Sequence, residues 1–173
     1  MKANSIFLAA IFLLLAAARV PATTFYVNVS NTVPVAPYTN WPTAATNIQD
    51  AVDASTDGDF ILVTNGVYSS GGRVISDGTT NRVAVIKAVT LQSASGPETT
   101  LISGKSTMRC IYLTNGAFAV GFTLTNGSTS KNGGGVRCES SSVISNCIVT
   151  GCNATNLPIQ REEAFMAAIF GTA

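Results

Sequence analysis

The chain has 173 residues, a formal net charge of +1 from 10 basic and 9 acidic residues, and no histidine. The near-neutral charge provides no electrostatic basis for binding nucleic acid. The absence of histidine excludes Ser-His-Asp and Cys-His catalysis and histidine-ligated zinc.

The N-terminal residues have the pattern of a secretory signal peptide. Lys2 precedes an apolar run from Ile6 to Ala18, and Val20-Pro21-Ala22 offers small residues to a signal peptidase. The run is too short for a stable membrane span. We therefore expect residues 1–22 to be removed and the mature chain to be secreted, extracellular or at the cell surface. An uncleaved anchor is the alternative.

Cleavage would remove Lys2 and Arg19, which leaves 8 basic residues and 9 acidic ones and a charge of −1. The mature chain is rich in Thr, Ser, Asn and Gly and poor in charged residues, which is typical of extracellular proteins built from strands and turns. About 150 residues remain, enough for one domain with a modest core.

One helix is expected before the main series of strands. Apolar residues recur at helical spacing after Asn47, which predicts a helix over about residues 44–55 with Thr43 as its N-cap. Its apolar face would cover the open end of a stack of strands. The polar residues expected on its exposed face are Gln49, Asp50 and Asp53.

Short apolar segments separated by Gly or Asn turns occupy the rest of residues 23–155. Each is too short to be stable without a neighbour. The expected strands are Thr24–Val29, Phe60–Thr64, Val83–Lys87, Val89–Ser93, Thr100–Ser103, Cys110–Thr114, Val120–Gly127, Gly135–Glu139 and Ser145–Cys152.

These segments repeat at variable spacing. Gly121–Thr125 aligns with Asn146–Thr150 at an offset of 25 residues. Val89–Leu91 precedes Phe122–Leu124 by 33, and Arg109-Cys110 precedes Arg137-Cys138 by 28. Variable spacing around a repeated strand indicates a solenoid whose loops differ in length.

Residues 48–68, IQDAVDASTDGDFILVTNGVY, resemble the N-terminal cap and first coil of the pectin lyase-like superfamily, and VGFTLTNG and SNCIVTGC resemble its coil repeats. The resemblance implies an all-β fold, a right-handed parallel β-helix of about four coils over residues 23–155, with the helix at 44–55 as its N-terminal cap. The superfamily includes lyases, hydrolases, esterases, adhesins and structural modules, so the fold does not fix the function.

Residues 156–173 lack the repeat. Gln160–Phe170 has the pattern of a short amphipathic helix, which would cap the last coil. The alternative is that the chain is a truncated form of a longer β-helix. An uncapped coil end would favour self-association through its open strand edges.

Three basic residues are the candidate ligand-binding residues: Arg109, Arg137 and Lys87. The 28-residue offset places both arginines outward on neighbouring strands, as a cationic ladder suited to the carboxylate or sulfate groups of an acidic polysaccharide. The alternative is that they are solvated surface charges.

A polysaccharide lyase of this superfamily would imply clustered acidic residues that hold Ca²⁺, and an Arg or Lys base. Acidic residues are sparse between the first coil and the tail, where they are Asp77, Glu98 and Glu139. Asp57 and Asp59 flank Gly58 and are expected to be turn residues rather than a catalytic pair. We therefore assign no catalytic residue, no metal ligand and no cofactor, with Ca²⁺ reserved for the lyase alternative.

The cysteines are Cys110, Cys138, Cys147 and Cys152. In an exported chain they could form disulfides with three connectivities, or remain as stacked thiols in the core.

The sequence thus predicts a secreted, non-catalytic β-helix module that is structural or contacts extracellular or cell-wall polysaccharide. The alternatives are a fragment of a pectate-type lyase that acts by β-elimination, with one of the three basic residues as the base, and a surface adhesin repeat.

Overall fold

The computed structural model describes residues 21–155. The expected signal peptide, apart from its last two residues, and the expected C-terminal helix lie outside the described residues. The strands are β1 (Thr24–Val27), β2 (Phe60–Val63), β3 (Gly66–Tyr68), β4 (Arg73–Val74), β5 (Thr80–Val85), β6 (Thr90–Ser93), β7 (Thr100–Ser103), β8 (Arg109–Leu113), β9 (Phe118–Val120), β10 (Thr123–Thr125), β11 (Ser128–Thr129), β12 (Val136–Cys138), β13 (Val143–Ser145), β14 (Ile148–Thr150) and β15 (Asn153–Ala154).

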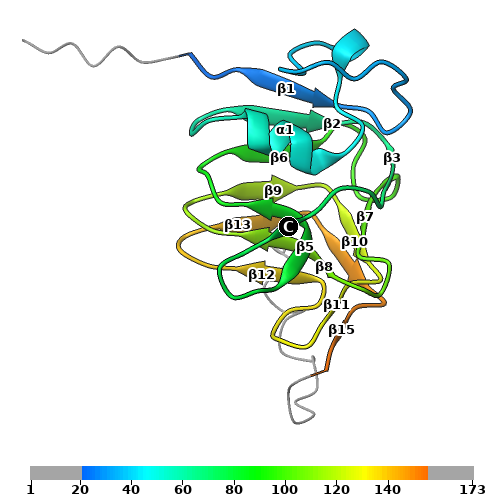
Figure 1. The fold of residues 1–173 in the computed structure, drawn as a ribbon, viewed down its shortest axis with the longest axis vertical. Helices are drawn as coiled ribbons and strands as arrows, with labels where there is room; N and C mark the ends of the chain where they lie inside the picture. Colours follow the sequence, from blue (N-terminus) through cyan, green and yellow to red (C-terminus); the bar gives the residue numbers. More distant parts are fainter. Residues whose placement is uncertain (1–20, 156–173) are drawn as a thin grey trace, which may run out of the picture.

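The strands form three larger sheets and one small pair, with orders β1-β2-β6-β9-β13, β14-β10-β7-β3, β12-β8-β5-β4 and β11-β15. Apart from the antiparallel pair β4 and β5, paired strands are parallel. Consecutive strands such as β6, β7 and β8 lie in three different sheets, and the chain then returns to the first sheet at β9 (Figure 1). The expectation of a mainly β fold with parallel sheets and one α-helix is confirmed.

The strand register tests the repeats read from the sequence. Thr123 pairs with Ile148, so the offset of 25 is confirmed. The offset of 33 is wrong, because β6 pairs with β9 and β10 belongs to another sheet. The offset of 28 is also wrong, because Arg137 pairs with Tyr112.

The helix α1 (Ile48–Ala54) is shorter than expected. Its N-cap is Asn47, whose side chain accepts a hydrogen bond from the backbone of Asp50. Thr43 instead ends a short 3₁₀ helix, η1 (Trp41–Thr43). The observed N-cap therefore lies four residues after the expected one.

Gln49 is buried, contrary to the expectation that it faces solvent. Its side-chain oxygen accepts a hydrogen bond from the backbone N–H of Ala84 at 2.8 Å, and its side-chain nitrogen donates to the Ala84 carbonyl at 3.3 Å. Buried backbone groups need hydrogen-bond partners, and the Gln49 amide supplies one to the N–H and one to the carbonyl of the same β5 residue. The contact attaches α1 to the β12-β8-β5-β4 sheet.

The side chains between the sheets form one apolar core. Its fully buried members include Val27, Ile48, Ile61, Leu91, Ile102, Ile111, Leu113, Phe122 and Leu124. Among the described residues, no helix is long and apolar enough to cross a membrane.

The turn role expected for Asp57 and Asp59 is confirmed. The Asp59 carboxylate accepts hydrogen bonds from the backbone of Thr23 at 2.8 Å and of Thr56 at 2.7 Å. Asp57 accepts one from the backbone of Ala88 at 2.9 Å. Both carboxylates are therefore used to hold neighbouring chain segments together.

Candidate functional site

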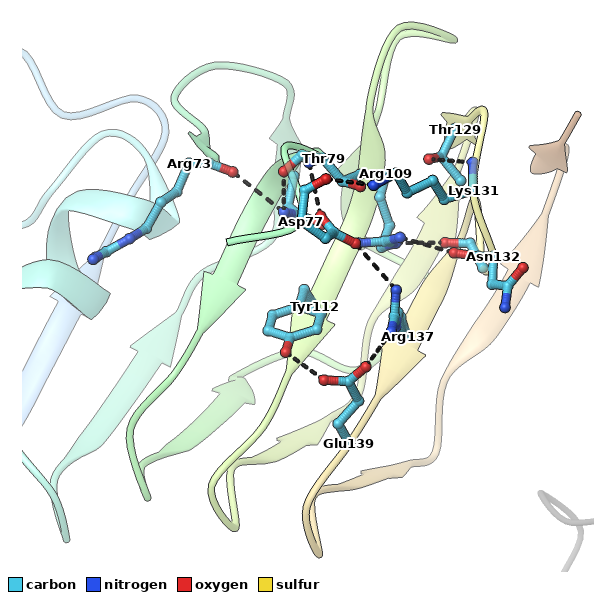
Figure 2. A network of polar contacts seen from close by, with 12 residues as sticks. Arg73, Asp77, Thr79, Arg109, Tyr112, Thr129, Lys131, Asn132, Arg137 and Glu139 are labelled. Carbon is cyan, nitrogen blue, oxygen red and sulfur yellow. Dashed lines mark hydrogen bonds and ion pairs between the residues drawn. The ribbon is translucent and has the colours of Figure 1, made fainter. Parts of the chain in front are cut away.

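A polar network lies on one face of the β12-β8-β5-β4 sheet (Figure 2). Tyr112 and Arg137 come from the neighbouring strands β8 and β12, where they are register partners. Asp77 comes from the turn between β4 and β5, and Lys131 from the segment between β11 and β12. Residues from three sequence regions thus gather on one surface, which is a common way to build a binding site from loops on a rigid scaffold.

Arg137 is held between two carboxylates. It donates from Nη1 to Asp77 Oδ2 at 3.1 Å and from Nη2 to Glu139 Oε1. Figure 2 shows the two carboxylates approaching its guanidinium from opposite sides. The side chain of Arg137 remains one-third exposed (33%), so a ligand can still reach it.

Tyr112 extends the network, because its hydroxyl donates to Glu139 Oε2 at 2.6 Å. This hydrogen bond and the neighbouring Arg137 charge lower the pKa of Glu139. The same hydrogen bond, together with burial, raises the pKa of Tyr112. At neutral pH the pair is therefore a phenol and a carboxylate, with the proton on the phenol.

Asp77 is also ionised. Its pKa is lowered by Thr79 first, with smaller contributions from the charges of Lys131 and Arg109. Lys131 Nζ donates to the backbone carbonyl of Asp77. Neither carboxylate of the network therefore carries a proton that it could give to a leaving group at neutral pH.

Arg109 is fully buried, with 0% of its surface exposed. It donates to Asn81 Oδ1 at 2.7 Å and to the backbone carbonyls of Gly133 at 2.8 Å and Asn132 at 2.8 Å. Its guanidinium carbon lies 6.0 Å from the centre of the Tyr112 ring. Burial lowers its pKa from the ordinary arginine value.

The expected ladder of Arg109 and Arg137 is therefore wrong. The register partner of Arg137 is Tyr112, and the partner of Arg109 on the preceding strand is Asn81. The sequence alignment misplaced Arg137 by three residues along the partner strand. Arg109 holds the β11-to-β12 segment in place, whereas Arg137 lies on the surface.

Lys87 lies away from this network. Its Nζ donates to the carbonyls of Val52 at 3.0 Å, Asp53 at 2.9 Å and Ser55 at 2.5 Å. These carbonyls are at the C-terminal end of α1, where the helix leaves acceptors unpaired and favours a positive charge. The structure thus uses Lys87 to cap the helix.

A shallow pocket of about 160 Å³ adjoins the network. Six of its nine lining residues carry hydroxyl groups, and the lining residues are Gly78, Thr79, Thr80, Thr107, Met108, Ser128, Thr129, Ser130 and Lys131. Lys131 lines the pocket and contacts Asp77 as well, so the pocket and the charged network form one continuous polar surface.

No family model, curated protein or solved structure matches the chain. The site must therefore be interpreted from its own chemistry. Within residues 21–155, no three histidine, cysteine or acidic side chains gather where they could hold a metal ion.

The four cysteines occupy different environments. Cys110 and Cys147 are buried and Cys138 is exposed, and these three are free thiols. Cys152 is half-buried and packs against the core.

Sequence reasoning missed Tyr112 and Lys131 as site residues. The signal for Tyr112 was present, because extending the offset of 25 residues from Thr123 and Ile148 to this sheet places Arg137 opposite Tyr112. Lys131 carried no comparable signal, because its position depends on how the segment after β11 folds over the sheet.

Proposed function

We propose that the chain is a secreted, non-catalytic module, folded as a right-handed parallel β-helix, that contacts an extracellular or cell-wall polysaccharide. The contact surface would be the Arg137 network together with the adjoining hydroxyl-lined pocket.

The order of the strands supports the β-helix. A chain that passes through three sheets in turn and returns to pair in parallel with its previous circuit builds a solenoid. The helix α1, attached to β5 through Gln49, would cap the N-terminal end of this solenoid. The apolar N-terminal segment supports export.

The observation that carries the proposal is the continuous polar surface from the pocket to Arg137 and Glu139. Sugar rings present many hydroxyl groups, each able to donate and accept hydrogen bonds. The pocket supplies hydroxyls, Asp77 and Glu139 supply charged acceptors, and Arg137 and Lys131 supply charged donors. Hydrogen bonds to charged groups are the stronger kind, which suits recognition of a polar polymer.

The protonation states support binding without catalysis. Hydrolysis of a glycoside needs one protonated carboxyl, and the pKa values of Asp77 and Glu139 are both lowered. β-Elimination needs a base, and the pKa of Tyr112 is raised. Arg109 is buried and Lys87 is used at the helix end, which leaves Arg137 as the candidate base of the lyase alternative. Its ion pairs with Asp77 and Glu139 favour the charged, protonated form of its guanidinium, which cannot accept a proton.

The local charge favours an acidic polysaccharide over a basic ligand. Arg109, Arg137 and Lys131 give three positive charges against the two negative charges of Asp77 and Glu139, a local balance of +1. The carboxylates neutralise most of this positive charge. We therefore expect weak binding of the acidic polysaccharide, which decreases at high salt.

Binding of pectate, alginate and a neutral glucan to the purified chain tests the proposal. We expect Arg137→Ala and Lys131→Ala each to weaken binding of the acidic glycans by about fivefold, the size of effect of one partly exposed charged contact. Arg73→Ala is the matched control, because Arg73 forms an exposed ion pair with Asp53 outside the network.

Absorbance at the unsaturated-uronide band is measured in the same samples, with and without Ca²⁺. We expect no increase. An increase that Arg137→Ala abolishes would establish the lyase alternative. Absence of binding to every glycan by a folded chain would refute the proposed contact surface and favour an adhesin or structural role.

A further inference from the structure

Cys110 and Cys152 are far apart in the sequence, but their side chains lie next to the same backbone segment. Cys110 belongs to β8 and is fully buried. Cys152 directly precedes β15, whose first residue Asn153 pairs with Ser128. Gly127, the residue before Ser128, is therefore next to Cys152 across the strand pair.

The two thiols point to the same short stretch of backbone. Cys110 Sγ donates to the carbonyl of Thr125 at 3.1 Å, and Cys152 Sγ lies 3.6 Å from the carbonyl of the preceding residue, Leu124. The backbone N–H of Gly127 donates to Cys152 Sγ at 3.3 Å. The Cys152 thiol also raises the pKa of Cys110, which places the two side chains near each other.

Two glycines pack against the sulfur atoms. A Cβ on Gly127 would lie 2.1 Å from Gly134 O and 2.8 Å from Cys110 Sγ. A Cβ on Gly135 would lie 2.6 Å from Val149 Cγ1 and 3.0 Å from Cys152 Sγ. Both thiols therefore lie in tightly packed surroundings, where a larger residue at either glycine would displace its neighbours.

We propose that Cys110 and Cys152 form a disulfide when the chain folds in an oxidising compartment. The bond would tie the last described strands to β8 and close a loop of roughly 40 residues, which restricts the unfolded chain. It would also remove one buried and one half-buried thiol from a chain that we propose to be secreted.

The oxidant is a small-molecule disulfide, here oxidised glutathione. The half-buried Cys152 thiolate attacks one glutathione sulfur, and a glutathione thiolate leaves. Cys110 then attacks Cys152 Sγ, its proton passes to the departing second glutathione, and the protein disulfide forms. One oxidised glutathione thus becomes two reduced molecules, while the two cysteines lose two hydrogens.

Cys138 and Cys147 are not part of this pair. Cys138 is exposed, whereas Cys147 is buried, with its Sγ accepting from the backbone of Phe122 at 3.4 Å and donating to the Ser145 carbonyl at 3.2 Å. Burial raises the pKa of Cys147, and burial together with the neighbouring Cys147 raises the pKa of Cys138. The proposal leaves both as thiols, and a bond between them would appear inside the tryptic peptide 138–161.

The test is to refold the full chain from urea in a glutathione redox buffer, block remaining thiols, and map tryptic peptides without reduction. Cleavage after Arg109, Lys131, Arg137 and Arg161 places Cys110 alone in peptide 110–131, and the other three cysteines in peptide 138–161. We expect these two peptides to be joined, with fragmentation of the joined species assigning the bond to Cys152.

Variants provide the matched controls. The joined species should persist in Cys138→Ser and Cys147→Ser and disappear in Cys152→Ser. The oxidised chain should melt about 10 °C above the reduced chain, with no such difference in Cys152→Ser. A bond inside peptide 138–161, a joined species that persists in Cys152→Ser, or a folded chain with four blocked thiols would each overturn the proposal. These measurements need no glycan, so they are independent of the proposed binding.

Discussion

Replacing Arg109 with methionine tests whether the Arg109 side chain stabilises the fold or is a solvated surface charge. Methionine keeps much of the side-chain volume but removes every N–H donor. Three acceptors would lose their partner: Asn81 Oδ1 and the carbonyls of Asn132 and Gly133, now 2.7, 2.8 and 2.8 Å from the guanidinium.

The expected loss of stability follows from these contacts. The bond to Asn81 is buried, and the bonds to the carbonyls of Gly133 and Asn132 are part-buried. A buried acceptor left without a donor costs about 1–3 kcal/mol and a part-buried one less, because water can replace the donor, while removing the buried charge returns part of the cost. We expect the free energy of unfolding to fall by about 4 kcal/mol. With an m-value of about 2 kcal/mol/M for a chain of this size, the urea midpoint should fall by about 2 M.

Urea titration followed by circular dichroism measures this change, with Arg73→Met as the control. The ion pair of Arg73 with Asp53 is exposed, so the control should change the unfolding free energy by less than about 1 kcal/mol. Equal small effects from both variants would show that Arg109 behaves as a solvated surface charge, and would refute its structural role.

Two further predictions concern the carboxylates and the helix end. Because the folded pKa values of Asp77 and Glu139 are lowered from 3.8 and 4.5, their stabilising contribution is complete above the ordinary values and is lost as the pH falls through the lowered ones. Urea midpoints should therefore decrease below about pH 5. The decrease should be smaller in the double variant Asp77→Asn and Glu139→Gln. Identical pH profiles of the urea midpoint in the variant and the unchanged chain would contradict this prediction. Lys87→Met should destabilise α1 by about 1 kcal/mol and speed amide hydrogen exchange in that helix. The control Lys105→Met should leave both unchanged. Unchanged exchange in Lys87→Met would exclude the capping role.

The local features of the fold could be predicted from the sequence because they depend on residues that are close together in the chain. Of the Asn-Gly turns at 65, 115 and 126, Asn115 and Asn126 adopt the expected left-handed conformation, with φ of 56° and 50°, whereas at the first turn the positive φ falls on Gly66. The strand expected at Thr100–Ser103 is the observed β7, because its β-branched and apolar residues suit a strand in any context. The turn roles of Asp57 and Asp59 followed from their position beside Gly58 in the same way.

The candidate site required the tertiary structure, because its contacts depend on register and on loop lengths. A shift of three residues in the alignment of β8 with β12 replaced Tyr112 by Arg109 as the expected neighbour of Arg137. The offset of 25 residues between Thr123 and Ile148 gives the correct register when it is applied to β8 and β12. No such period places Lys131 and Asn132, because the segment between β11 and β12 folds back to meet Asp77 and Arg109.

Within residues 21–155, the sequence by itself located most of the longer strands, several of the turns and the region of the α-helix. Only the tertiary structure decided which charges are exposed. Lys87 and Gln49 are residue types that are usually exposed. Each nevertheless forms hydrogen bonds with backbone groups more than 30 positions away in the chain. A polar side chain is buried only where distant backbone groups need its hydrogen bonds, and that need exists only once the segments have packed together.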